Sequence, residues 1–113
     1  MDLYNYKATV VKVIDGDTVK LNIDLGFNIS WTTPCRLAGI NTDELKSKDT
    51  VLQESAKGAK TYMELLLKEG SKVTIKSKSL DKYKRPIVIL QTDKGLNINE
   101  ELVLKGYAKP YMV

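Results

Sequence analysis

Polar and apolar residues alternate along the first part of the chain, which is the pattern of strands that bury one face. Residues 6–13 are rich in β-branched side chains, and the pattern resumes at residues 18–23 after Asp15-Gly16-Asp17, which predicts a hairpin. A second turn at residues 24–28 leads into residues 29–40. We interpret these as a third strand interrupted near Pro34, because proline cannot donate to a strand ladder and marks an edge or a bulge. Three antiparallel strands in a meander are predicted.

The apolar spacing becomes helical in the middle of the chain. A helix is predicted at residues 50–68, with Gly70 as its stop signal and Gly58 as a sign of close packing on the sheet. Its apolar positions are Leu52, Ala56, Ala59, Met63 and Leu66. Two further strands are predicted at residues 73–76 and 86–92, joined by a charged turn at 81–85. A short helix is expected at residues 99–105, where Gly106 ends it.

Five strands, with one helix after the third and another near the end, predict a mainly β, α+β fold. The arrangement fits a five-stranded OB-type barrel, whose strand face and loops commonly bind oligonucleotides. Since 113 residues are close to the commonest size for a single core, we expect one domain over residues 1–113.

Composition narrows the class of protein. A hydrophobic fraction of 42% with 28% charged residues is that of an ordinary globular protein, and no apolar run approaches the ~18 residues that span a bilayer. The first residues lack a basic start and an apolar core, so a cytoplasmic location is expected, with secretion left open for a trimmed chain. Cys35 is the only cysteine, which excludes an internal disulfide, and it is expected to be a small buried residue.

The charged residues restrict the possible chemistry. Lysine and arginine number 18 against 14 acidic residues, a net charge of +4 that mildly favours polyanionic partners. The chain has no histidine, which excludes imidazole bases and zinc–histidine sites. Hydrolytic chemistry would therefore depend on carboxylates, arginines and a hard cation.

Residues 36–44 concentrate such groups. Arg36 lies in an apolar strand, and the following loop carries a run of oxygen-bearing side chains that ends in Glu44. Asp17 supplies another carboxylate upstream, and Arg85 supplies another guanidinium downstream. Oxygen donors beside guanidiniums suit phosphate-ester chemistry on an oxygen-ligated cation.

Each segment also has a simpler structural interpretation. Asp15-Gly16-Asp17 can be a hairpin turn alone, residues 41–44 a polar loop, and residues 81–85 a solvated turn. Arg36 is harder to explain in this way, because a cation inside an apolar strand requires a partner.

Four segments in this order resemble the staphylococcal nuclease (thermonuclease) family. They are residues 13–19 (VIDGDTV), 36–44 (RLAGINTDE), 81–85 (DKYKR) and 99–108 (NEELVLKGYA). The resemblance runs from about residue 7 to the end of the chain. It implies an OB-type barrel with helices and calcium-dependent hydrolysis of phosphodiester bonds in DNA and RNA.

The resemblance also implies a calcium site. It makes Asp17 the carboxylate ligand of Ca²⁺, Asn41 the second side-chain ligand and the Thr42 carbonyl the third. Asn41 replaces a family aspartate, so the site loses one formal negative charge, and affinity for a hard cation falls with the number of carboxylates.

The catalytic roles are implied in the same way. Glu44 corresponds to the carboxylate that activates or orients the attacking water, and Arg36 and Arg85 correspond to the arginines that grip the scissile phosphate. Lys82 and Tyr83 match residues beside the terminal phosphate and the nucleotide.

A further departure from the family concerns the turn before Arg85. Lys84 stands where the family has glycine, so a backbone that requires positive φ there would be strained.

The leading hypothesis is a calcium-dependent nuclease, expected to be a monomer that acts on DNA, RNA or both and does not contact a membrane. Endonucleolytic and exonucleolytic attack both stay open. The alternative is a catalytically weak or inactive module that binds nucleic acid or a protein partner, and a third possibility is a purely structural interaction domain.

Overall fold

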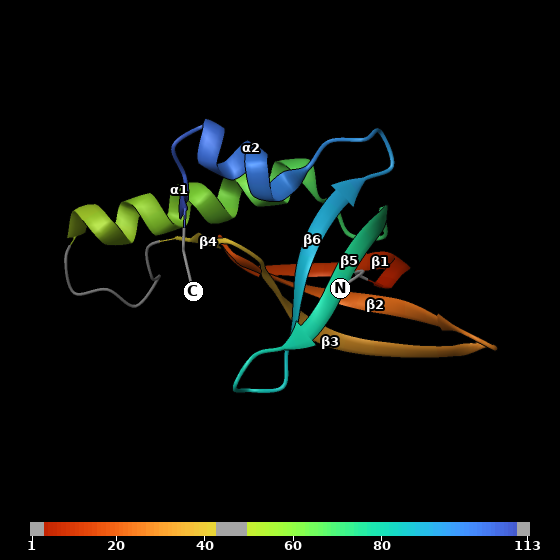
Figure 1. Cartoon of the computed structure of the whole chain (residues 1–113). Coiled ribbons are helices and arrows are strands. Elements are labelled where there is room, and N and C mark those ends of the chain that lie inside the picture. Colours follow the sequence, from red (N-terminus) through yellow and green to blue (C-terminus); the bar gives the residue numbers. More distant parts are fainter. Residues whose placement is uncertain (1–3, 43–49, 111–113) are drawn as a thin grey trace.

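The computed structural model describes residues 4–42 and 50–110, and Figure 1 shows two helices on one side of a strongly twisted set of strands. The elements are β1 (Tyr4–Asp15), β2 (Thr18–Gly26), β3 (Ile29–Leu37), β4 (Ile40–Asn41), α1 (Thr50–Leu66), β5 (Lys72–Leu80), β6 (Pro86–Thr92), α2 (Ile98–Leu104) and β7 (Lys109–Pro110). Five long strands and two helices confirm the predicted fold class.

The five long strands form a closed barrel in the order β1-β2-β3-β6-β5. The first three strands are the predicted meander, and β5 and β6 form the predicted second hairpin. The ring closes through a short parallel pairing of β3 with β6, in which Arg36 is opposite Ile87 and Leu37 is opposite Val88. This closure places the end of β3, with Arg36, beside the start of β6, which Arg85 precedes.

The prediction that Pro34 interrupts the third strand is wrong. β3 runs through Pro34 to Leu37 and breaks afterwards, at Ala38 and Gly39, where Gly39 has a φ of +73°. Because β6 pairs only with Arg36 and Leu37, Pro34 lies where β3 is an edge strand and its lack of an N–H costs little. The small pairing of β4 with β7 was not predicted, since two-residue strands carry no periodic signal.

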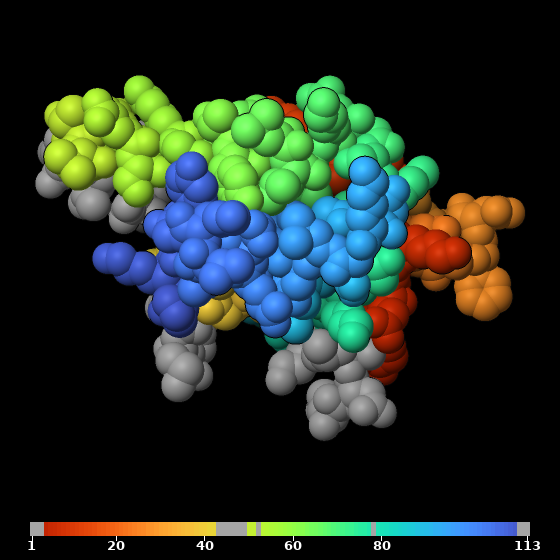
Figure 2. All heavy atoms as spheres, turned by 90° about the horizontal axis from the view of Figure 1, so that it is seen from above, coloured from red at the N-terminus to blue at the C-terminus, as the bar shows by residue number. Residues whose placement is uncertain are grey.

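The helices lie close to their predicted bounds and beside each other over the barrel (Figure 2). Asn97 caps α2, because its side chain accepts a hydrogen bond from the Glu100 N–H. The aromatic rings of Tyr62 and Tyr107 stack with centroids 4.9 Å apart between them. Gly58 faces Tyr107, since a Cβ there would lie in ordinary van der Waals contact, 3.4 Å from its ring; the packing predicted at Gly58 is thus against Tyr107 and not against the sheet.

The apolar core fills the barrel and continues beneath both helices. Its fully buried members include Val10, Leu21, Leu37, Ile75, Leu90, Met63 and Leu102. Cys35 is buried among them as predicted, and burial raises the pKa of its thiol to about 12, so it is a packing residue and not a nucleophile. No helix in residues 4–42 and 50–110 is long and apolar enough to cross a membrane.

Asn99 is a buried polar residue that joins α2 to the barrel. Its amide nitrogen donates to the carbonyl oxygens of Ala38 (2.9 Å) and Val88 (3.0 Å), and its side-chain oxygen accepts from the Leu90 N–H (3.0 Å). The bond to Ala38 holds the chain just beyond β3, where it turns toward β4. Asn99 therefore fixes the segment that follows Arg36.

We expect Asn99→Ala to lower the free energy of unfolding by about 3 kcal/mol, since buried backbone groups would lose their partner at ~1–3 kcal/mol each. Urea unfolding followed by circular dichroism measures the change. Asn97→Ala is the matched control on the same helix, with an expected cost of about 1 kcal/mol for the lost cap. Equal losses for the two variants would contradict the role given to Asn99.

Candidate functional site

The centre of the candidate site is an ion pair between the β1–β2 turn and β3. Asp17 lies in this turn, and its Oδ2 is 2.9 Å from Nη1 of Arg36. Both side chains are largely buried, with 14% and 20% of their surface exposed. The partner that the sequence required for a cation in an apolar strand is therefore Asp17.

Arg36 also reaches the chain that follows β3. Its Nη2 atom donates to the carbonyl oxygen of Ile40 and to Oδ1 of Asn41, both at 3.1 Å. Its Nη1 atom is covered by protein and, among the residues that the structure describes, has no aligned hydrogen-bond acceptor, although it lies 2.9 Å from the Asp17 carboxylate. One guanidinium thus joins three segments of the chain, and its Nη1 atom contacts Asp17 through an ion pair without an aligned hydrogen bond.

Thr42 is held against the same carboxylate by a close approach of the backbone. Its N–H donates to Asp17 Oδ2 at 3.3 Å. A Cβ added to Gly16 would lie 2.7 Å from the Ala59 Cβ and 3.1 Å from the Thr42 hydroxyl oxygen, so only glycine fits between α1 and Thr42. Gly16 of the Asp-Gly-Asp motif is therefore required for packing against α1 and Thr42 as well as for the turn.

Asp15 places a second carboxyl group beside Asp17. Burial, followed by the hydrogen bond and the like charge of Asp17, raises the pKa of Asp15 from 3.8 to about 6. Burial alone would also raise the pKa of Asp17, but the hydrogen bond with Asp15, the charge of Arg36 and the Thr42 N–H lower it. The two carboxyl groups thus share a site in which a second full negative charge is unfavourable.

Arg85 is held by its own turn. Its Nε lies 2.7 Å from Asp81 Oδ2, and its backbone N–H donates to Asp81 Oδ1 at 2.9 Å. The guanidinium of Arg85 and the ammonium of Lys82 lie 5.5 and 5.2 Å from the centre of the exposed Tyr83 ring. Burial would raise the pKa of Asp81, but the Arg85 and Tyr83 N–H groups and the Arg85 charge lower it, so it stays an anion over most of the pH range.

The structure arranges the predicted residues as two groups. Asp17, Arg36, Asn41 and Thr42 form one connected cluster, whereas Lys82, Tyr83 and Arg85 form another on the β5–β6 turn. Among the described residues no hydrogen bond or ion pair joins the two groups, although strand pairing brings them to the same end of the barrel. Glu44 lies outside the described residues.

The sequence of this chain is similar to those of known proteins. Residues 34–113 match the family described as staphylococcal nuclease homologue. The chain belongs to the staphylococcal nuclease family. It is similar to endonuclease YhcR of Bacillus subtilis (strain 168), with 31% identity over 96% of this chain and 9% of the relative, and to the uncharacterized protein MJ1439 of Methanocaldococcus jannaschii, with 29% identity over 96% of this chain and 60% of the relative. The chain spans less than two thirds of either relative.

Membership of the staphylococcal nuclease family implies a calcium ion, and the chemistry of the donors fits one. Asp15 and Asp17 provide carboxylates, Asn41 provides an amide oxygen, and the chain has no histidine that would favour a softer metal. In residues 4–42 and 50–110, however, no three acidic, histidine or cysteine side chains form a ready-made cluster. In this structure Arg36 supplies the positive charge beside Asp17.

Sequence reasoning missed three residues that shape this nuclease-family site. Asp15 was named only as part of an oxygen-rich turn and was given no role at the site, although its closeness to Asp17 in the sequence indicated that the two carboxyl groups could lie together. Gly16 has no sequence signal for its contact with Ala59, because α1 is far along the chain. Asn99 had one weak signal, since it lies beside Ile98 and one turn before Leu102 on the apolar face of α2.

The turn of the nuclease-family site carries the backbone strain that the sequence predicted. Lys84 has a φ of +63°, a conformation that costs a residue with a Cβ about 1–2 kcal/mol. We therefore expect Lys84→Gly to raise the free energy of unfolding by about 1 kcal/mol in urea denaturation. The matched control is Lys82→Gly, the same change in the same turn at a residue without positive φ, which should lower stability by about 0.5–1 kcal/mol. Destabilisation by both changes would refute the strain.

Proposed function

We propose that this protein is a calcium-dependent nuclease that hydrolyses phosphodiester bonds of DNA or RNA at the cluster of Asp17, Arg36 and Asn41. The observation that carries the proposal is the buried guanidinium of Arg36, which contacts an oxygen-rich cluster and keeps one unaligned donor. Family membership and the similarity to a protein named an endonuclease support the same reaction class.

In this proposal the Asp17–Arg36 pair opens when substrate binds. Arg36 turns its two-pronged donor set toward the scissile phosphate, for which a planar guanidinium is better suited than an ammonium. Asp17, Asn41 and the Thr42 carbonyl then hold Ca²⁺, with Asp15 nearby. When bound, the cation would neutralise phosphate oxygens as charge builds on them. Before the exchange, Asp17 and Arg36 balance each other's charge. After it, the cation would balance the charge of Asp17, and the phosphate would balance that of Arg36.

The remaining groups act on water and on the second side of the phosphate. Glu44 takes a proton from the attacking water, or orients that water for in-line attack, while the P–O bond opposite the attacking oxygen breaks and the leaving oxygen takes a proton from solvent. Arg85 exchanges its contact with Asp81 for the phosphate, while Lys82 and Tyr83 hold the neighbouring phosphate and nucleotide. Both arginines start from a paired, partly buried state, so their electrostatic effect on phosphate is stronger than in bulk water.

The alternative is a module that binds nucleic acid or a protein without turnover. Its supporting observation is that both arginines already have carboxylate partners, while Asn41 brings no charge to the metal site. A cation must then replace Arg36 beside Asp17 with fewer carboxylates than the family provides.

The activity test uses labelled single-stranded DNA and RNA in calcium, in magnesium and in chelator. We expect cleavage in calcium only, and a loss of about 10²–10⁴-fold in Glu44→Gln, the usual scale of general-base catalysis. Arg36→Lys should also lower the rate, because it loses the two-pronged contact. Glu54→Gln, the same change on the exposed face of α1, is the control and should be unchanged. If both the natural protein and Asn41→Asp bind the strands without cleaving them, the nuclease proposal is wrong and the binding module is the remaining function.

Calcium affinity is tested by calorimetry, with and without a nucleotide bisphosphate. We expect weak binding that Asn41→Asp strengthens, since it adds a carboxylate, and that Asp17→Ala abolishes. The exposed Asp93→Ala is the control for nonspecific loss of charge. Tight binding that survives Asp17→Ala would place the cation elsewhere.

A further inference from the structure

The β2–β3 hairpin extends beyond the rest of the barrel. Its far end projects clear of the other elements in Figures 1 and 2. β6 pairs only with Arg36 and Leu37, so among the described residues β3 has no strand partner on that side from Ile29 to Cys35. The barrel is therefore closed between β3 and β6 only at Arg36 and Leu37, and beyond this short pairing the two strands diverge.

A small apolar cavity of about 210 Å³, which we call the hairpin groove, lies where these strands diverge. Its floor is formed by the buried core residues Ile23 and Ile75. Its walls come from three separate parts of the chain and comprise the apolar and aromatic residues Tyr4, Tyr6, Leu25, Trp31, Leu80 and Pro86, together with Ser77 and Ser79. Trp31, opposite Ile23 in the strand pairing, is 40% exposed, and Tyr4 is 68% exposed. Large aromatic faces thus stay open to solvent.

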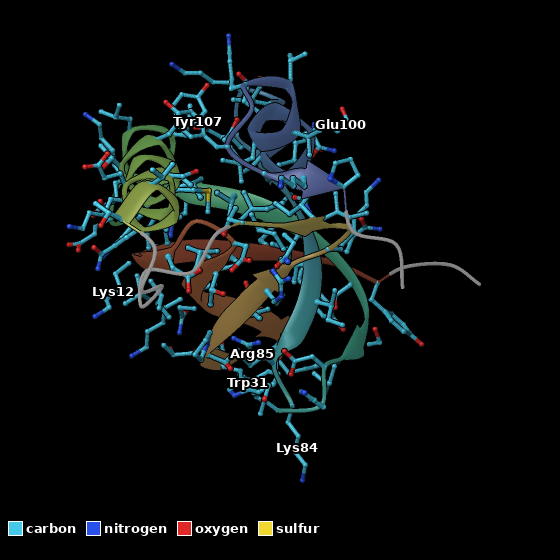
Figure 3. All side chains as sticks on the ribbon, turned by 90° about the vertical axis from the view of Figure 1, so that its left-hand side faces the viewer. Lys12, Trp31, Lys84, Arg85, Glu100 and Tyr107 are labelled. Atoms are coloured by element: carbon cyan, nitrogen blue, oxygen red, sulfur yellow. The ribbon has the colours of Figure 1, made fainter. Side chains whose placement is uncertain are left out.

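The hairpin groove adjoins a basic segment. Pro86, on its wall, directly follows Arg85, and Lys82 and Lys84 lie in the same turn. Trp31 and Arg85 both lie at the lower end of the barrel in Figure 3, where Lys84 points away into solvent. An apolar slot lined by aromatic rings and bordered by cations has the chemistry of a single-stranded nucleic-acid site, in which bases stack and lysine or arginine follows the backbone.

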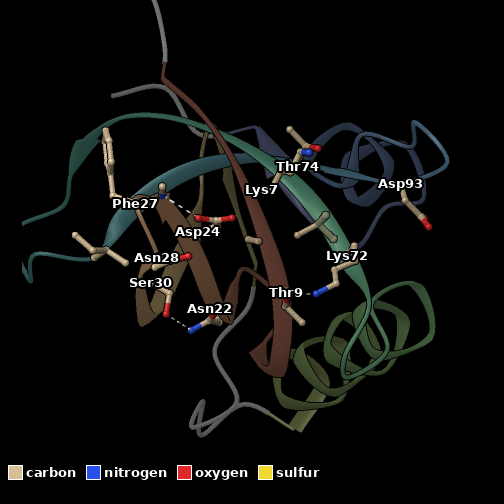
Figure 4. Close-up of a pocket in the computed structure, with 14 residues that line it drawn as sticks. Lys7, Thr9, Asn22, Asp24, Phe27, Asn28, Ser30, Lys72, Thr74 and Asp93 are labelled. Carbon is tan, nitrogen blue, oxygen red and sulfur yellow. Dashed lines mark hydrogen bonds between the residues drawn. The ribbon is translucent and has the colours of Figure 1, made fainter.

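The size of the groove selects a single ring system. Sites for drug-sized ligands occupy about 300–1,000 Å³, so about 210 Å³ admits one flat group. A larger groove, of about 850 Å³, lies elsewhere, between polar side chains of β1, β2 and β5 (Figure 4). Phe27 borders that second groove at the hairpin tip and does not line the hairpin groove.

We propose that the hairpin groove binds one unpaired base of the nucleic-acid substrate by stacking on Trp31, next to the phosphate held at Arg85. The proposal rests on the proposed function and adds to it a preference for single strands, because a paired base cannot enter the groove. The occupant is a nucleobase and not a second copy of the chain, since the basic turn at its border repels another molecule of net positive charge and attracts phosphate.

Trp31 is the only tryptophan, so the protein carries its own probe. In chelator, which prevents cleavage, oligothymidylate should quench tryptophan fluorescence, and the duplex of the same length should do so far less. Trp31→Leu should weaken binding of a labelled oligothymidylate, measured by anisotropy, by about 5- to 150-fold, the range for loss of one base–aromatic contact. Trp31→Phe should recover part of that loss.

Phe27→Leu is the matched control, since it removes an aromatic ring from the same hairpin outside the groove, and it should bind as the natural protein does. An oligothymidylate with one abasic position, moved along the strand, should bind the natural protein weakly at one position only, and Trp31→Leu should not show that dependence. Urea unfolding of each variant shows that the fold is kept.

The outcomes separate the two proposals. Calcium-dependent cleavage with equal binding by Trp31→Leu and Phe27→Leu overturns the hairpin groove and leaves the nuclease intact. Absence of both binding and cleavage in the natural protein overturns the nuclease and the groove together. A concentration-dependent dimer in analytical ultracentrifugation that Trp31→Leu dissociates, without an effect on oligonucleotide binding, would assign the groove to a second copy.

Discussion

The ion pair of Asp17 with Arg36 is the interaction on which the candidate site depends. A guanidinium at the buried end of β3 needs an anionic partner, and removal of one member of a buried pair typically costs about 3–5 kcal/mol. The pair ties the β1–β2 turn to β3, and the second nitrogen of the guanidinium holds Ile40 and Asn41. Three segments that are distant in sequence therefore keep a common geometry through one side chain.

Packing from the helices keeps this geometry in place. On one side, α1 approaches the turn so closely that Gly16 cannot accept a side chain beside Ala59 and Thr42. On the other side, α2 holds the Ala38 carbonyl through buried Asn99. The packing of the two helices on the barrel therefore determines the geometry of the polar site. Changes within either helix–barrel interface would move the donors around Arg36.

The ion pairs of the two arginines affect both proposed functions, the nuclease and the binding module. Each arginine of the site has a carboxylate of its own, Asp17 for Arg36 and Asp81 for Arg85. Such pairs keep the arginines ordered, and a phosphate must compete with them. In a nuclease, binding of a cation and a phosphate together must offset the free energy lost when these ion pairs open. In a binding module, the phosphate contacts alone must do so. The strained backbone at Lys84 lies in the β5–β6 turn, beside Arg85. Strained backbone often occurs near functional groups.

Sequence alone determined the five long strands, the two helices and the family, because alternation, helical spacing, caps and short motifs are local signals. It also located the strain at Lys84, since a family glycine marks a backbone that a side chain disfavours. Tertiary structure alone decided which partner Arg36 has, why Gly16 must lack a side chain and what Asn99 does, because those contacts join residues far apart in the chain. The hairpin shows the same limit. Leu25 was predicted to lie in the turn at residues 24–28, but β2 continues to Gly26, and Leu25 and Trp31 are each 40% exposed near the part of β3 that does not pair with β6.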